Sequence, residues 1–163
     1  MEKLYNDILN ILRNDCRYSA SKVAAMLGQK EETVKAAIEK MEAEKIIVKY
    51  AAIVNSEKLN DNNQVTALIE VKVTPQRNRG FDAIAEDIYC FSEVKDVYLM
   101  SGGFDLAVLI EGKSLREVAA FVSEKLSVMD TVVATATHFI LKKYKTEGVI
   151  IGGIESIKRN IVG

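Results

Sequence analysis

Apolar side chains in the first fifty residues recur at intervals of three and four, the spacing of one helix face. Helices are therefore expected near residues 3–14 and 31–44, with a shorter helix between them. A serine at 19 or 21 can cap the shorter helix, and Gly28 can end it in a left-handed turn. Three short helices with a glycine turn before the third predict a helix-turn-helix. Their apolar positions are Leu4, Ile8, Ile11, Leu12, Val23, Ala24, Leu27, Val34, Ala37, Ile38 and Met41.

The chain between the helices and the next alternating segment has two parts. Residues 46–55 (IIVKYAAIVN) are mostly apolar and predict a strand that leads out of the helical domain. Residues 59–64 (LNDNNQ) are polar and rich in turn formers, which is typical of a linker.

Alternation of apolar and polar positions resumes at Val65 and continues in an ordered series of elements. The series is strand, helix, strand, strand, helix, strand, which predicts a ferredoxin-like βαββαβ domain. Ser114 and Glu117 form a capping box at the start of the second helix. The expected ranges are 65–73, 81–91, the two strands within 94–111, a helix from 114 to about 126, and 131–144.

One face of such a sheet carries both helices, so the other face is polar unless something covers it. Here the second face is mixed, because Leu68, Ala107 and Leu109 point away from the helix side. An exposed apolar sheet face indicates an interaction surface, which favours a homodimer packed sheet to sheet. The alternative is that the C-terminal tail covers this face with Val149, Ile150, Ile151 and Ile154.

A short Ser101-Gly102-Gly103 turn joins the two central strands, and Asp105 follows it. Paired glycines permit positive φ and leave backbone N–H groups uncovered. A carboxylate beside such amides can hold both ends of a small zwitterion, such as an amino acid. An ordinary hairpin is the alternative interpretation.

The third helix carries the candidate DNA contacts, because the second helix of a helix-turn-helix pair enters the major groove. Glu31 and Glu32 at its start suit the helix dipole but repel phosphates. A three-helix bundle that only supports dimerisation is therefore the alternative. The residues expected to face DNA are Gln29, Lys30, Thr33, Lys35 and Lys40.

Composition and charge narrow the class of protein only slightly. The 163 residues are 48% hydrophobic and 28% charged, as in globular domains, and the net charge is −1. No apolar run approaches the roughly 18 residues of a membrane span, and no secretory signal precedes the first helix. We therefore expect a cytoplasmic protein without a membrane partner. Cys16 and Cys90 share no metal-type spacing, and we expect no metal or cofactor.

These segments, in this order, resemble the Lrp/AsnC family, the feast/famine transcriptional regulators. The resemblance runs from residue 2 to about 146. The helix-turn-helix with Ala24, Gly28 and Val34, followed by MEAEKIIVKYAAIVN (41–55), resembles the family's recognition helix and hinge strand. MSGGFDLAVLIEG (100–112) resembles its effector-domain turn, and DTVVATATHFILKKYK (130–145) resembles its closing strand.

The resemblance implies an α+β chain with a winged-type helix-turn-helix (1–50), a hinge strand and linker (51–64), a ferredoxin-like effector-binding and oligomerisation domain (65–146) and a tail (147–163). It implies homodimers that assemble into tetramers, octamers or larger rings. It also implies an amino acid or similar small effector bound between subunits. The residues carried over to that effector site are Ser101, Gly102, Gly103, Phe104 and Asp105, with Thr135, Thr137 and His138 from the facing subunit.

The implied function is a DNA-binding transcriptional regulator that responds to its effector and is not an enzyme. The third helix departs from the family pattern, because it has Lys35 and Lys40 but no arginine. One alternative is therefore a sensing or assembly module with weakened DNA binding. Another is an enzyme resembling sirohaem decarboxylases, against which the single histidine and the lack of an arginine cluster in the C-terminal half argue.

Overall fold

The computed structural model describes residues 2–59, 64–75 and 80–151. The chain divides into two compact units, Met1–Val54 and Asn55–Gly163. The division falls inside the expected hinge and linker region 51–64. Each unit has its own cluster of buried hydrophobic residues and is described by itself.

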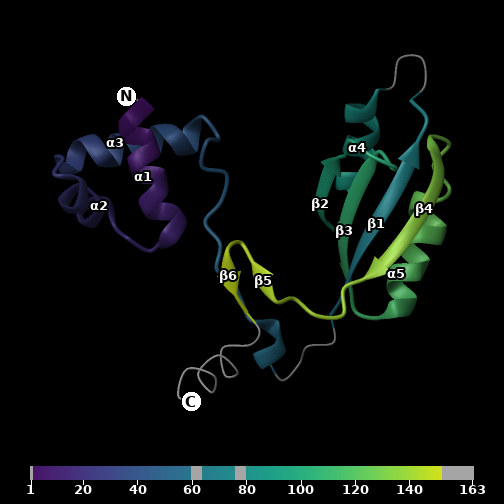
Figure 1. The fold of residues 1–163 in the computed structure, drawn as a ribbon. Helices are drawn as coiled ribbons and strands as arrows, with labels where there is room; N and C mark the ends of the chain where they lie inside the picture. The colour runs from purple at the N-terminus through teal and green to yellow at the C-terminus, as the bar shows by residue number, and fades with distance from the viewer. Residues whose placement is uncertain (1, 60–63, 76–79, 152–163) are drawn as a thin grey trace. The chain divides into compact units, whose positions relative to one another are not determined.

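The first unit is the predicted helix-turn-helix (Figure 1). Ser19 caps the second helix by accepting a hydrogen bond from the Lys22 N–H, and Gly28 ends it with a left-handed φ of 62°. These two local signals fix the tight turn before the third helix. The helices are α1 (Glu2–Asn14), α2 (Ala20–Leu27) and α3 (Glu31–Ala43).

The core of the first unit forms at the positions that the helical spacing selected. Ile8, Val23, Val34 and Met41 are fully buried, so each helix contributes to one small cluster. Lys30 stands at the N-cap of α3 and makes no side-chain capping bond. The first turn of α3 is therefore held by packing and by its acidic residues rather than by a cap.

The expected strand over residues 46–55 is wrong for the single chain. Lys45 takes a left-handed φ of 59°, and the N–H groups of Ile46 and Ile47 both donate to the Met41 carbonyl, which ends α3. Residues 48–55 belong to no strand. An extended segment becomes a strand only when a neighbouring backbone takes its N–H and C=O groups. We call residues 46–55 the hinge segment.

The second unit has the predicted βαββαβ order, with four antiparallel strands in the order β2-β3-β1-β4 (Figure 1). A three-residue turn, η1 (Ser56–Lys58), precedes the sheet. The main elements are β1 (Val65–Val73), α4 (Phe81–Tyr89), β2 (Val94–Leu99), β3 (Leu106–Gly112), α5 (Leu115–Phe121), the π-type turn η2 (Val122–Leu126) and β4 (Val132–Phe139).

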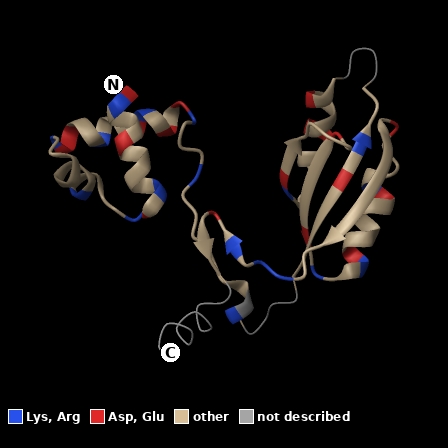
Figure 2. Ribbon diagram, viewed as in Figure 1, with Lys and Arg blue, Asp and Glu red and all other residues tan. Residues whose placement is uncertain are grey.

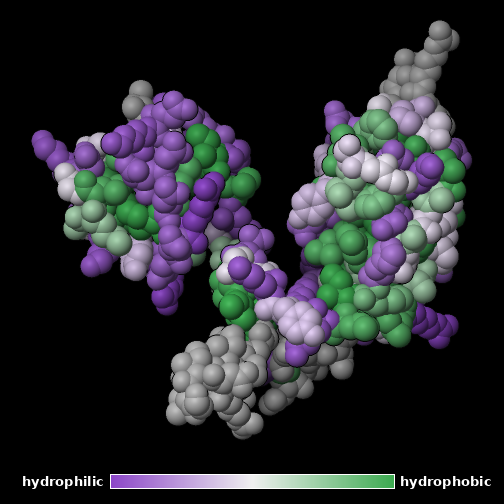
Figure 3. Space-filling view, viewed as in Figure 1, coloured by the Kyte–Doolittle hydropathy of each residue, from purple (hydrophilic) through white to green (hydrophobic). Residues whose placement is uncertain are grey.

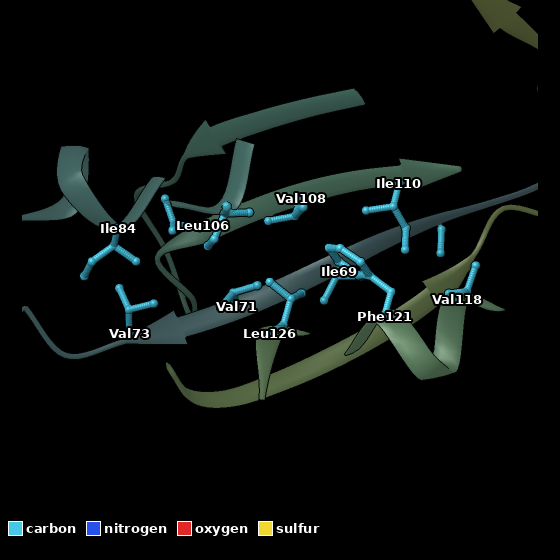
Figure 4. Packing of buried hydrophobic residues seen from close by; sticks show 12 residues of the cluster. Ile69, Val71, Val73, Ile84, Leu106, Val108, Ile110, Val118, Phe121 and Leu126 are labelled. Carbon is cyan, nitrogen blue, oxygen red and sulfur yellow. The ribbon is translucent and has the colours of Figure 1, made fainter. Parts of the chain in front are cut away.

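The core of the second unit lies between the sheet and its two helices. Alternate residues of β1 and β3 face α4 and α5, as the period of two requires. The close view shows these side chains directed toward one another from strands and helices (Figure 4). Its fully or almost fully buried members are Ala67, Ile69, Val71, Ile84, Ile88, Leu106, Val108, Ile110, Val118 and Leu126.

The other sheet face, which we call the open face, carries both apolar and charged side chains. Leu68 pairs with Leu109 on one side and with His138 on the other, so these three residues form a row across the sheet. The His138 Nε2 atom lies 3.3 Å from the Glu70 Oε1 atom. The space-filling view shows apolar and hydrophilic residues mixed on the side of this unit in view (Figure 3). The prediction of a mixed face is confirmed.

The chain after β4 contains a small hairpin that the sequence interpretation placed partly in a tail. It consists of β5 (Lys145–Thr146) and β6 (Val149–Ile150). Glu147 and Gly148 both have positive φ, 48° and 80°, as a two-residue type I′ turn requires. Val149 and Ile150 remain about half exposed. Ile154, which the alternative interpretation placed over the sheet, lies outside the described residues.

Candidate effector turn and DNA-reading helix

The turn expected to bind an effector connects β2 to β3 and is exposed at residues 101–103. Neither Gly102 nor Gly103 takes a positive φ, so the turn does not use the conformational freedom that paired glycines permit. A Cβ atom added at either glycine would meet nothing within 4 Å. These glycines therefore keep the turn small and open rather than enabling a left-handed conformation.

Asp105 fixes the end of this turn through three hydrogen bonds. Its backbone N–H donates to the Val71 carbonyl at 3.1 Å, and its carbonyl accepts from the Met100 N–H at 2.8 Å. Its Oδ2 atom accepts from the Val73 N–H at 2.8 Å. The β1–β3 pairing ends at Val71 and Leu106. The carboxylate thus takes the N–H that β3 no longer reaches, and Asp105 has a structural role that the sequence did not predict.

Asp105 still has hydrogen-bonding capacity after this contact. An ionised carboxylate offers about four acceptor positions on two oxygens, and the Val73 N–H uses one of them. The side chain is half-buried beside the exposed Ser101, Gly102 and Gly103, whereas Phe104 is half-buried and precedes the strand. The turn thus presents a fixed negative charge next to accessible backbone.

The three candidates on β4 do not lie together. Thr135 pairs with Val71 and Thr137 with Ile69, so both threonines lie on the side of the sheet that faces the helices. His138 lies on the open face, beside Glu70. Thr135 is at the end of the sheet that also carries Asp105, because Val71 pairs with both Thr135 and Leu106. A single chain therefore does not gather all the effector candidates into one pocket.

The candidate DNA contacts of the first unit are all exposed. Gln29 and Lys30 precede α3, and Thr33 lies in its first turn. Lys35 and Lys40 each lie near a glutamate one turn later, with Nζ–Oε1 distances of 4.0 Å to Glu39 and 3.7 Å to Glu44. Such exposed pairs contribute little to stability, so both lysines can exchange glutamate for phosphate at small cost.

The charge of α3 is unfavourable for a helix that approaches DNA. The helix contains Glu31, Glu32, Glu39 and Glu42 against Lys35 and Lys40. Figure 2 shows acidic and basic residues mixed over the helices of this unit. Phosphate attraction must therefore come largely from basic residues beside α3, of which Lys22, Lys30, Lys45 and Lys49 are exposed.

A contact that sequence reasoning missed joins the hinge segment to α3. The Tyr50 hydroxyl donates to the Glu42 Oε1 atom at 2.8 Å. Partial burial of the ring and this bond to a carboxylate raise the pKa of Tyr50 to about 12. An aromatic residue eight positions after a helical glutamate gives no pattern by which the sequence alone could have revealed the contact.

A second missed cluster stabilises the helical side of the second unit. The Lys125 ammonium pairs with Glu93 and lies 5.1 Å and 5.6 Å from the ring centroids of Phe91 and Phe121. The hydrogen bond from Lys125 lowers the pKa of Glu93. This cluster connects the start of β2 to η2 and contains none of the effector candidates.

The described ranges contain neither a candidate metal site nor a helix suited to cross a membrane. No group of three or more histidine, cysteine or acidic side chains there is arranged to hold a metal ion. None of the helices in those ranges has the length and apolar character needed to cross a membrane.

Comparison with known families matches both units. Residues 66–150 match the Lrp/AsnC ligand binding domain, and residues 6–48 match a winged helix-turn-helix DNA-binding domain. The chain belongs to the Lrp/AsnC family. The Lrp/AsnC resemblance that the sequence motifs indicated is therefore confirmed, together with the α+β fold and a role in transcription regulation.

Individual relatives agree with this assignment. YugG, an HTH-type transcriptional regulator of Bacillus subtilis, is 49% identical over 96% of this chain and 94% of its own. A Neisseria meningitidis transcriptional regulator solved in complex with L-Met has a TM-score of 0.71 at 19% identity, covering 90% of this chain and 93% of its own. Escherichia coli AsnC has a TM-score of 0.68 at 19% identity, covering 90% and 95%. The two structures show the shared fold.

Proposed function

We propose that this Lrp/AsnC regulator binds an amino acid or a related small molecule at the 101–105 turn, between copies of the chain, and that binding changes its assembly or its affinity for DNA. The observation that carries the proposal is the state of Asp105. Its carboxylate is fixed by the Val73 N–H, yet it keeps free acceptor positions beside exposed backbone. A fixed carboxylate next to accessible amides suits a zwitterion.

The need for a second copy follows from where the candidates lie. Thr135 and Thr137 share one sheet face and His138 lies on the other, so one chain cannot present all of them to one ligand. A homodimer that packs through the open face, and then assembles further, would supply from a second copy the candidate residues that one chain cannot bring to the ligand. The L-Met complex of the Neisseria meningitidis regulator is a property of that protein and supports the ligand class only by analogy.

The direct test is a mobility-shift titration with the DNA upstream of the protein's own gene, repeated with each of the twenty amino acids. We expect a shift that one amino acid, or a small group, strengthens or weakens. Sedimentation under the same conditions reports whether the assembly changes, as it must if the ligand acts by preferring one assembly. A panel in which no amino acid alters either readout would contradict the proposal.

Asp105→Asn separates the two roles of this residue. The amide oxygen can still accept from the Val73 N–H, but the charge that would pair with an ammonium is gone. We expect the variant to bind DNA normally and to lose most of its response to the effector. Asp82→Asn is a matched control, because Asp82 is an exposed acid on α4 and not part of the turn. Equal responses of Asp105→Asn and wild type to the effector would exclude the 101–105 turn as the effector site.

The role of α3 is tested by Lys35→Ala combined with Lys40→Ala. Each lost phosphate contact lowers the dependence of log affinity on log salt by about one unit. We therefore expect weaker operator binding and a salt slope lower by up to about two. An unchanged slope would show that α3 does not contact the phosphates.

A sensing or assembly module with weakened DNA binding is the second candidate, and the acidic character of α3 favours it. It predicts no shift of upstream DNA at physiological salt, together with ligand-dependent assembly. The same titration therefore distinguishes the two candidates.

A further inference from the structure

The outward side of α3 is defined by the residues it buries. Val34, Ala37 and Met41 face the core. The positions farthest from them, one turn apart along the helix, form a row that we call the outward row. All its members are exposed. The row consists of Glu32, Ala36, Glu39 and Ala43.

The lysines flank this outward row instead of occupying it. Lys35 lies on one side, next to Glu32 and Glu39, and Lys40 lies on the other, next to Ala36 and Ala43. A helix in the major groove directs its outward side to the base edges and its flanks to the two phosphate backbones. The part of α3 nearest the bases is therefore acidic at Glu32 and small at Ala36.

A carboxylate among base edges has a definite preference. Guanine offers only acceptors, N7 and O6, in the major groove, whereas cytosine offers the N4 amino donor. Adenine offers a donor next to an acceptor, which suits an amide better than a carboxylate. A glutamate in this place therefore favours cytosine and repels guanine.

Glu31 and Glu32 differ in position although they are neighbours. Glu31 lies one turn before the buried Val34 and two turns before Ile38, near the side of α3 that packs on the core. Its charge suits the amino end of the helix dipole. Glu32 lies at the start of the outward row, among the first residues of a recognition helix, which usually meet the bases.

We propose that Glu32 is a specificity-determining residue of this protein, whose carboxylate accepts a hydrogen bond from N4 of a cytosine in each half-site of the operator. The proposal rests on the proposed DNA-binding function. It gives the acidic start of α3 a role in sequence selection, with phosphate attraction supplied by lysines beside the helix such as Lys30. The acidity is then compatible with tight binding to selected DNA.

Selection of full-length protein against random duplex DNA tests this assignment. We expect wild type to enrich sites with one invariant cytosine in each half-site. Glu32→Gln should replace it by adenine, which a glutamine amide pairs with in a bidentate manner. Glu32→Ala should relax the position to no preference. Glu31→Gln, the matched control, should keep the wild-type motif.

In Glu32→Gln, the affinity for the wild-type site and the affinity for random-sequence DNA should change in opposite directions. Glu32→Gln should weaken binding to the wild-type site by about 5- to 150-fold, the range for loss of one good base contact. It should also strengthen binding to random-sequence DNA, because it removes a negative charge near the phosphates. A glutamate that only stabilised the helix would not produce opposite signs.

The outcomes are distinguishable from failure of the proposed function. If wild type enriches a motif and Glu32→Gln enriches the same motif with equal affinity, the assignment of Glu32 is overturned and the regulator function stands. If Glu31→Gln removes the cytosine preference as fully as Glu32→Gln does, a general effect of negative charge explains the preference, and the assignment of Glu32 is overturned. If wild type enriches no motif at all, both the assignment and the proposed function fail.

Discussion

The two units hold their candidate functional side chains in contrasting ways. In the first unit, Lys35 and Lys40 are exposed and pair with neighbouring glutamates on the same helix or just after it. In the second unit, Asp105 is bound to the backbone of another strand. Substitutions on α3 should therefore change binding with little effect on folding, whereas substitutions at Asp105 act on both. Variants of the second unit need controls that preserve the hydrogen bond.

The units also differ in the size of their cores. Among the residues that the structure describes, seven form the buried cluster of the first unit and twelve form that of the second. A smaller core leaves a smaller margin of stability. We therefore expect the helix-turn-helix to be the unit that unfolds first.

The largest effects should come from the two cores, and they test whether the units are separate. Ile8→Ala in the first unit and Ile69→Ala in the second each remove a fully buried side chain. Each should lower the free energy of unfolding of its own unit by about 2–5 kcal/mol. Amide hydrogen exchange, measured residue by residue, should show lost protection only in the unit that carries the change. Loss of protection in both units together would contradict their independence.

The next largest effect should come from Asp105→Ala, which leaves the Val73 N–H without its partner. An unpaired, partly buried N–H costs about 1–3 kcal/mol, so urea unfolding of the second unit should shift by that amount. Asp105→Asn should recover most of the loss. Equal destabilisation by alanine and asparagine would show that charge rather than hydrogen bonding fixes the turn.

Lys30→Ser should have a smaller effect, and it should raise the free energy of unfolding instead of lowering it. Position 30 is the N-cap of α3, and the lysine side chain makes no capping hydrogen bond there. A serine there should stabilise the first unit by about 0.5–2 kcal/mol. The same change removes a cation near DNA, so operator binding should weaken while thermal stability rises. Lys30→Ala is the control, since it removes the charge without adding a cap. Equal stability of the serine and alanine variants would exclude the capping explanation.

The smallest effect concerns the hinge segment and pH. The pKa of Tyr50 is raised from 10.0 to about 12 in the folded chain. Between these values the folded state holds the phenolic proton that the unfolded state loses, so the free energy of unfolding falls as pH rises from about 10. Tyr50→Phe should flatten that part of the stability curve only slightly, because Tyr50 is 44% exposed. Identical curves above pH 10 would contradict this.

Local signals determined most of the secondary structure. The three- and four-residue spacing located α1, α2 and α3, and Ser19 and Gly28 marked the limits of α2 as predicted. The alternation of β1 and β3 selected the same inward residues that the structure buries. These features depend on residues within a turn or two of one another, where each side chain's preference acts directly on the backbone.

Only the tertiary structure decided how the candidate sites are held. Within the described residues it formed no strand in the hinge segment, and it gave Gly102 and Gly103 no left-handed conformation. It joined Asp105 to Val73, 32 residues away in the sequence. Each of these outcomes depends on which backbone groups lie nearby after folding. The sequence therefore determined most of the elements, their order and the buried faces, whereas the hinge segment, the β5–β6 hairpin and the partners of individual polar groups followed from packing between distant segments.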